Sequence, residues 1–367
     1  MRNCIVIGSG GTGGHLYPTI AVAEEIRKER PDIRIVFIGT QDRIEAREVP
    51  RAGFEFFAIN IQAPGKSIVS LARFPFQYLK ASRRAKHLLQ ELSASVFLGG
   101  GAYLSVPIAF AAKSQHIPIA LLEINAVPGR ANKVLAPVAE KVFVAYPEAV
   151  SGFGKANTEK IEVVGTPVRI SLVNSTQNPQ DARKYFGLRQ DKKTLLVFGG
   201  SLGARSINEA IAGQANEFLK HGYNIIWQTG KSADASHLQH QFPDRSSIAI
   251  FEYINEMDKA YAACDVVVSR AGASTLAELA TLGKPAILVP YPLAIRNHQE
   301  HNARAFERAD AAIVITDDRL NEYLGEAVER LMHSDSDRLH MSEKIRNREN
   351  KEARKVVAQW LIARCTL

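Results

Sequence analysis

A dense cluster of glycines ends in a histidine near the N-terminus, in the stretch IVIGSGGTGGH at residues 5–15. Glycines let a backbone approach an anion closely, and the first N–H groups of the helix expected after them have no partners within that helix. The helix dipole adds positive potential at the same place. We therefore expect this turn to hold a phosphate, with His15 as a base or as a hydrogen-bond partner of a diphosphate.

Two later stretches repeat the order of apolar run, glycines and helix start. They are LVFGGSLGAR at 196–205 and SRAGASTLAELATLG at 269–283. In the second stretch, Ser274 is expected to cap the helix and Gly283 to end it. Glu278 lies one turn inside, where a carboxylate can accept two hydrogen bonds from a ribose diol. Taken alone, a glutamate in such a place is more often a solvated helix residue.

Other nucleotide-binding and metal-binding patterns match less well. The GxGxxG spacing of residues 8–13 fits a dinucleotide site, but the second expected strand ends in Gly39 and Thr40 without the acidic residue of a nicotinamide enzyme. No P-loop Lys-Ser/Thr pair follows the glycines. The one Asp-x-Asp, at 335–337, is expected in a loop between helices. We therefore predict chemistry without a metal or other cofactor, the helix start at 274–278 replacing a cation.

Apolar runs alternate with segments of helical periodicity, which is typical of parallel sheets with crossover helices. Two series of runs, separated by a polar break near 166–192, predict two α/β domains in tandem. The expected strands are 4–7, 33–38, 96–98, 119–122, 141–144 and 161–164, followed by 195–198, 225–227, 248–251, 266–269, 286–289 and 312–315. Apolar residues at helical spacing in the tail predict a last helix that packs on a structure already built.

Charge and composition narrow the classes of partner. The 367 residues carry a net charge of +8, and a basic surface favours nucleic acid, anionic lipid or a phosphorylated substrate. Three scattered cysteines indicate neither a disulfide framework nor a zinc site. We find no signal peptide and no run of about 18 apolar residues that would span a membrane, so a reducing cytoplasm is expected.

The basic charge is concentrated between Glu55 and Glu91, where six Lys or Arg occur without any acidic residue. Apolar side chains are interleaved with them, a pattern that suits docking on an anionic membrane surface. The expected membrane contacts are Lys66, Ile68, Leu71, Arg73, Phe74, Phe76 and Lys80. The alternative is a core-packing helix with a solvated basic face, which we expect for much of 76–92.

The order and spacing of GGTGGHLYP, GGSLGAR and SRAGASTLAELATLGKPAILVPYPLAIRNHQEHNA resemble the MurG family. The likeness spans nearly the whole chain, through GTQDRIEAREVPRAGFEF, LLEINAVPGRANK and VVGTPVR. It implies a GT-B fold with two Rossmann-like domains facing a cleft, here 1–166 and 167–341, and a C-terminal helix, 342–367, that packs back on the first domain. It also implies inverting transfer of N-acetylglucosamine from UDP-GlcNAc to lipid I, which forms lipid II for peptidoglycan at the cytoplasmic face of the membrane.

The family's donor contacts transfer onto matching positions of this chain. They are Thr12, Gly13, Gly14, Asn125, Arg169, Ser201, Ile254 through its backbone, Ala273, Ser274, Thr275, Leu276, Ala277, Glu278 and Gln299. His15 and Glu123 are both candidates for the catalytic base. The chain departs from the family where Leu122 and Ile124 replace a common His and Gln, and where Ala102 and Val106 replace glycine or another small residue. Acceptor details therefore transfer less readily than donor details.

Two other functions remain as alternatives. A related UDP-sugar transferase acting on another lipid acceptor, such as a diacylglycerol, belongs to the same class. A nucleic-acid binder would use the basic segment with its Phe and Tyr residues, but no RNP, zinc-finger or helix-turn-helix signature supports it. We therefore expect no nucleic-acid partner.

Overall fold

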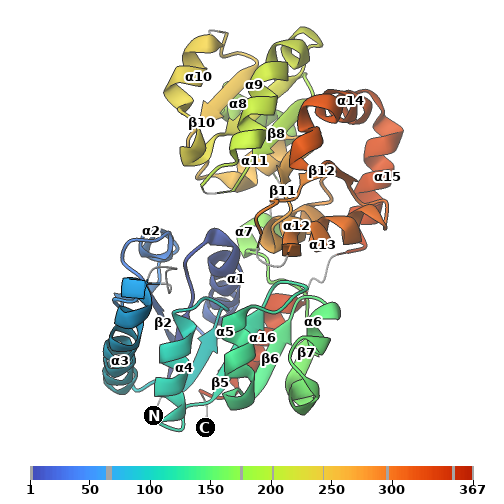
Figure 1. Ribbon diagram of the computed structural model, residues 1–367. Coiled ribbons are helices and arrows are strands. Elements are labelled where there is room, and N and C mark those ends of the chain that lie inside the picture. The colour runs from blue at the N-terminus through green and yellow to red at the C-terminus, as the bar shows by residue number, and fades with distance from the viewer. Residues whose placement is uncertain are drawn as a thin grey trace. The chain divides into compact units, whose positions relative to one another are not determined.

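The computed structural model describes residues 3–62, 68–173, 177–200, 202–242, 244–294, 297–348 and 352–365. The chain forms two compact units (Figure 1). The first unit is Met1–Ile170 together with Asn350–Leu367, and the second is Ser171–Glu349. Each unit contains one parallel sheet with its own hydrophobic core.

The sheet of the first unit has seven parallel strands in the order β3-β2-β1-β4-β5-β6-β7. They are β1 (Cys4–Gly8), β2 (Arg34–Gly39), β3 (Glu55–Ala58), β4 (Val96–Gly99), β5 (Ile119–Glu123), β6 (Lys141–Val144) and β7 (Ile161–Val163). Strand order reverses between β1 and β4, whose register pairs Gly8 with Gly99. Ligands of open α/β sheets bind beyond the carboxyl ends of the strands at such a reversal, which we call the switch point.

Helices surround this sheet. They are α1 (Gly13–Glu29), α2 (Glu45–Arg51), α3 (Ile68–Glu91), α4 (Ser105–Lys113), α5 (Arg130–Leu135), α6 (Glu148–Ser151) and α16 (Ala353–Ile362). Helices α3 and α4 pack together, and Leu88 and Ile108 join Val6 and Phe97 of the sheet in one core. These four residues are fully or almost fully buried, so their packing holds β1 in its place in the sheet.

The C-terminal helix α16 packs on α1, and Figure 1 shows it in red among the blue and green elements of the first unit. A buried ion pair joins the two helices, with Arg354 Nε 2.7 Å from Glu25 Oε2. The chain returns to the first unit near residue 350, later than the expected 342. The reason is that α15 (Asp335–Arg346) packs on the second unit, where Ser342 Oγ donates to the Gly283 carbonyl at 2.7 Å.

The second unit has six parallel strands in the order β10-β9-β8-β11-β12-β13. They are β8 (Thr194–Phe198), β9 (Asn224–Gln228), β10 (Ile248–Phe251), β11 (Val266–Arg270), β12 (Ala286–Val289) and β13 (Ile313–Val314). Its helices, besides α15, are α8 (Pro179–Tyr185), α9 (Arg205–Lys220), α10 (Ala235–Gln241), α11 (Met257–Ala263), α12 (Ala273–Leu282), α13 (His298–Glu307) and α14 (Leu320–His333), while α7 (Ile170–Val173) spans the boundary between the units. The switch point of this sheet lies between β8 and β11.

The prediction of an α/β protein with two Rossmann-like sheets is confirmed, because both strand orders are those of a doubly wound fold. Every expected apolar run corresponds to a strand, with ends that agree within one residue. Strand β3 was not expected. It is a four-residue edge strand on β2 that begins at the exposed Glu55, and its other three residues are only partly buried.

Candidate functional site

The first glycine turn, residues 8–14, connects β1 to α1 at the switch point of its sheet. Helix α1 begins at Gly13 after Thr12, and no side chain caps this end. Gly11 has a φ of +87°, a conformation that L side chains rarely adopt. The predicted residues Thr12, Gly13 and Gly14 therefore lie at an uncapped helix start beyond the carboxyl end of β1.

His15 lies in the first turn of α1 and is partly buried. Its Nδ1 is 3.0 Å from the carbonyl oxygen of Gly100, which follows β4 across the switch point. A carbonyl can only accept a hydrogen bond, so Nδ1 carries a proton, and in the neutral form of the ring the lone pair is then on Nε2. This is the tautomer that a general base requires.

Glu123, the other candidate base, ends β5 and is 1% exposed. Its Oε1 accepts from the backbone N–H and the Nδ2 of Asn125, at 2.9 and 3.0 Å. Its Oε2 accepts from the Gly129 N–H at 2.8 Å and from Asn132 Nδ2 at 3.0 Å. Both carboxylate oxygens therefore fasten the 124–129 loop to the sheet, and Asn125 is held as part of that loop.

Arg169 is brought to the same end of α1. Its guanidinium lies over the ring of Tyr17, 4.5 Å from the ring centroid. Tyr17 is one helical turn beyond Gly13. A Cβ atom added to Gly13 would lie only 3.0 Å from the Tyr17 ring. The first unit thus gathers Arg169, His15 and the helix start at one end of α1.

In the second unit, helix α12 follows β11 at the switch point. Its N-cap is Gly272, so the expectation that Ser274 caps the helix is wrong, and Ser274 lies within the first turn. Gly283 ends the helix in the left-handed conformation, as predicted. The Glu278 carboxylate accepts a hydrogen bond from Tyr261 Oη at 2.9 Å. Tyr261 is 1% exposed, so a buried phenol that we did not predict orients this carboxylate.

The glycine turn that follows β8 is connected by hydrogen bonds to the segment after β10. Gln228, buried at the end of β9, donates from Nε2 to the Gly200 carbonyl at 3.1 Å. Its Oε1 accepts the backbone N–H of Ile254 at 2.8 Å. A uracil contact at Ile254 would therefore use the carbonyl oxygen. Ser201 lies outside the described residues.

Arg270, at the end of β11, joins several strand and helix ends around the same switch point. Its Nη1 donates to two carbonyls at the end of β12, at 3.3 and 3.2 Å, and it pairs with Asp317. Its Nη2 donates to Ser206 Oγ in α9 at 3.0 Å. Nearby, Gln299 Oε1 accepts the N–H of Tyr291 at 3.1 Å. Gln299 is therefore held beside the carboxyl end of β12.

The Asp-x-Asp sequence is not in a loop, which corrects our expectation. Asp335 and Asp337 lie in the first turn of α15, and Ser334 caps that helix by accepting the Asp337 N–H at 3.1 Å. A hydrogen bond from Lys193 and the charge of Arg338 hold the pKa of Asp335 below its ordinary value. Asp337 pairs with Arg330 at 2.6 Å. These carboxylates serve a helix start and surface ion pairs.

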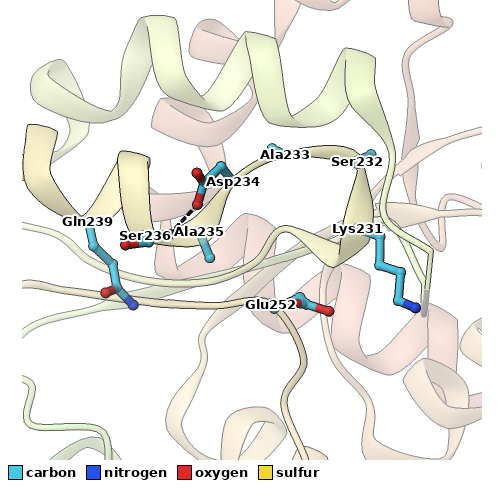
Figure 2. Close-up of a pocket in the computed structure, with 8 residues that line it drawn as sticks. All are labelled: Lys231, Ser232, Ala233, Asp234, Ala235, Ser236, Gln239 and Glu252. Carbon is cyan, nitrogen blue, oxygen red and sulfur yellow. Dashed lines mark hydrogen bonds between the residues drawn. The ribbon is translucent and has the colours of Figure 1, made fainter.

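A hollow of about 780 Å³ opens between the end of β10 and the start of α10. Figure 2 shows its lining, which consists of Lys231, Ser232, Ala233, Asp234, Ala235, Ser236, Gln239 and Glu252. Asp234 caps α10 by accepting the Ser236 N–H at 2.9 Å. None of the predicted site residues lines this hollow.

Comparison with known proteins identifies the family. Residues 5–144 match the N-terminal domain of glycosyltransferase family 28, and residues 194–359 match its C-terminal domain. The UDP-N-acetylglucosamine--N-acetylmuramyl-(pentapeptide) pyrophosphoryl-undecaprenol N-acetylglucosamine transferase of Christiangramia forsetii is 38% identical over 87% of this chain and 86% of its own. The protein of the same name from Salinibacter ruber is 37% identical over 98% and 96%. The crystal structure of Acinetobacter baumannii MurG superposes with a TM-score of 0.71 at 26% identity, covering 98% of this chain and 99% of that one. The chain belongs to the MurG family.

The positions where this MurG family member departs from the common pattern are largely interior. Leu122 and Ile124 are 1% and 3% exposed, and Ala102 is 6% exposed. Val106 is partly buried and packs against the same core. Apolar side chains thus fill the places where the family commonly has His and Gln.

Helix α3 carries the predicted membrane segment of this MurG family member. Lys66 lies outside the described residues, and the side chains of Ile68, Leu71, Arg73 and Phe74 are not described. Phe76 is 78% exposed and Leu79 is 49% exposed, next to the exposed Lys80. Farther along, Ala81, Ala85, Leu88 and Leu89 are buried, as expected for a core-packing helix. Among the described residues, no helix combines the length and hydrophobicity of a membrane span.

Proposed function

We propose that this MurG family member transfers N-acetylglucosamine from UDP-GlcNAc to lipid I, the undecaprenyl-pyrophosphoryl-MurNAc-pentapeptide, to form lipid II. The observation that carries this assignment is an identity of 37–38% to enzymes named for that reaction, over 86–96% of their length. The site geometry supports it, because Thr12, Gly13 and Gly14 lie at the switch point of the first sheet and Ala273 to Glu278 begin α12 at the switch point of the second.

His15 is the base in this proposal. The acceptor hydroxyl attacks the anomeric carbon, its proton passes to His15 Nε2, and the electron pair of the broken bond leaves with UDP. The hydrogen bond from Nδ1 to the Gly100 carbonyl supports this role, since it keeps the lone pair on Nε2. A positioned base contributes about 10²–10⁴-fold to such a rate. Glu123 is less suited, because four N–H groups already occupy its oxygens.

The departing diphosphate is stabilised by the start of α12, without a metal ion or other cofactor. This helix begins after Gly272 with no capping side chain, so its dipole and first N–H groups suit a growing negative charge. Glu278, oriented by Tyr261, accepts from the ribose diol. The ion pairs of the Asp335 and Asp337 carboxylates with Lys193 and Arg330 also support metal independence.

The acceptor is reached from the membrane surface by the exposed part of α3 around Phe76 and Leu79, on the cytoplasmic face. The exposure of Phe76 and Leu79 beside Lys80 supports this, since each Lys or Arg near an anionic leaflet contributes about 1 kcal/mol. The variant Lys80→Glu should bind phosphatidylglycerol vesicles about tenfold more weakly. The matched control Lys220→Glu reverses a charge that is 71% exposed in the second unit. Equal binding of the two variants would contradict docking through α3.

The function is tested by transfer of labelled N-acetylglucosamine from UDP-GlcNAc to a lipid I analogue, with a diacylglycerol as the competing acceptor. We expect product only with the lipid I analogue. His15→Ala should lower kcat by about 10²-fold or more and leave the KM for UDP-GlcNAc within about threefold. Transfer to the diacylglycerol alone would overturn the acceptor assignment, and an unchanged kcat in His15→Ala would remove this residue from the mechanism.

A further inference from the structure

Glu45 is a fully buried carboxylate beside the first glycine turn. It is the first residue of α2 and is 0% exposed. Its Oε2 accepts the backbone N–H of Gly11 at 3.0 Å. Its Oε1 accepts the N–H and the Oγ1 hydroxyl of Thr40, at 2.9 and 2.7 Å. One side chain thus joins the turn after β1 to the end of β2 and the start of α2.

Two glycines make room for this carboxylate. A Cβ atom on Gly10 would lie 2.3 Å from Glu45 Cδ, and one on Gly39 would lie 2.5 Å from Glu45 Cγ. Both distances are far below van der Waals contact, so neither position tolerates a side chain while Glu45 stays in place. The glycine at 10 therefore serves an internal carboxylate, where we had expected it to serve a bound phosphate.

The same contact changes how the turn can meet a ligand. The N–H of Gly11 is already bonded to a carboxylate, and a phosphate approaching that N–H would meet another anion. Ligand contacts therefore move along the turn to the start of α1 at Gly13 and to His15. A second hydrogen bond supports that end, since Ser9 Oγ donates to the His15 carbonyl at 2.8 Å.

We propose that Glu45 is a positioning residue for the transfer reaction. It fixes residues 9–12 so that the start of α1 and the His15 ring are held in reactive geometry, and it directs anionic groups away from Gly11. Glu45 acts through the turn and does not itself contact the substrate. The inference rests on the proposed role of His15.

The test is Glu45→Gln, which keeps the shape of the side chain but sets an amide NH₂ group against either the Gly11 or the Thr40 N–H. A displacement of about 1 Å in a reactive group can lower a rate by about 10²-fold, and we expect kcat to fall by about that factor. The KM for UDP-GlcNAc should stay within about threefold. Hydrogen exchange should accelerate in the peptide covering residues 8–16 and remain native elsewhere.

The matched control is Glu55→Gln, which removes the same charge from an exposed pair with Arg34 on the neighbouring strands. It should leave kcat within about twofold of the native value. If Glu45→Gln does not fold, Thr40→Val removes only the hydroxyl donor and should lower kcat about fivefold. Native kcat with native exchange at 8–16 in the folded variant would overturn the proposal, as would a rate loss matched by faster exchange throughout the chain.

Parallel measurement of His15→Ala separates this inference from the proposed base. If His15→Ala keeps its kcat while Glu45→Gln loses it, the base assignment fails and the positioning role of Glu45 stands through another group of the turn. If His15→Ala is slow while Glu45→Gln is native in rate and exchange, the positioning role fails and the base assignment stands.

Discussion

Arg354 determines how firmly α16 is attached to α1, and its replacement by methionine tests that packing. Arg354 is 8% exposed and its partner Glu25 is 1% exposed. Removing one partner of a buried ion pair costs about 3–5 kcal/mol, because the other charge stays buried. Lys28 Nζ, 3.4 Å from Glu25 Oε1, partly compensates the carboxylate. We therefore expect Arg354→Met to lower the free energy of unfolding of the first unit by about 3 kcal/mol.

Urea unfolding near pH 7 measures this loss through the fluorescence of Trp360. This residue lies in α16 against the Phe143 ring, with centroids 6.1 Å apart. The other tryptophan, Trp227, belongs to the second unit and is replaced by Phe in all variants. The matched control is Lys355→Met in the same helix, which breaks an exposed pair and should cost less than about 1 kcal/mol.

The pH dependence gives an independent check. Burial raises the pKa of Glu25, but the hydrogen bond and charge of Arg354, together with Lys28, lower it by more. The pKa of Glu25 in the folded protein therefore lies below its ordinary value. A carboxylate with a depressed pKa in the folded state stabilises the fold above its unfolded pKa of about 4.3 and loses that contribution as the pH falls through the folded value. The difference between native protein and Arg354→Met should therefore shrink below about pH 4.3. A cost below about 1 kcal/mol near pH 7, or a difference that does not shrink in acid, would refute the reasoning.

Three further outcomes are expected. Tyr261→Phe should raise the KM for UDP-GlcNAc about tenfold in initial-rate assays, because the Glu278 carboxylate loses the hydrogen bond that orients it; an unchanged KM would show that this hydrogen bond does not position Glu278 for UDP-GlcNAc. Gln228→Leu should weaken UDP binding about tenfold by calorimetry, since it releases the Ile254 N–H and the Gly200 carbonyl, and native affinity would exclude this bridge from the site. Dialysis against EDTA should leave kcat unchanged, and a loss that Mg²⁺ restores would refute metal-independent transfer.

The sheets could be predicted because buried parallel strands are nearly continuous apolar runs. Strands such as β1 and β8 are buried along their whole length, so their residue types alone indicate them. Strand β3 is the exception, because it is a short, partly buried edge strand beside the exposed Glu55, and its apolar residues 56–58 were passed over. We expected the wrong N-cap for α12 because serine is a common N-cap residue, which favours Ser274. In the structure the N-cap is Gly272, whose extended backbone precedes the helix.

The glycine turns and Glu278 could be read from the sequence, since their chemistry follows from local order. The residues that hold them could not. Glu45 meets Gly11 across 34 positions, and Gln228 meets Ile254 across 26. In each case at least one partner is a backbone group that carries no residue-specific signal. Only the folded sheet brings these groups together, so local sequence patterns cannot predict which side chains hold the turns in place.

The docking of α16 on α1 has a consequence for biosynthesis. A ribosome makes the whole of Ser171–Glu349 before it makes Ala353–Ile362. Until Ala353–Ile362 has been made, the first unit lacks α16, and the α1 surface around Glu25 stays uncovered. Translation order therefore leaves the earliest-made part of the protein to be finished last, and a chaperone that shields that surface would act in this interval.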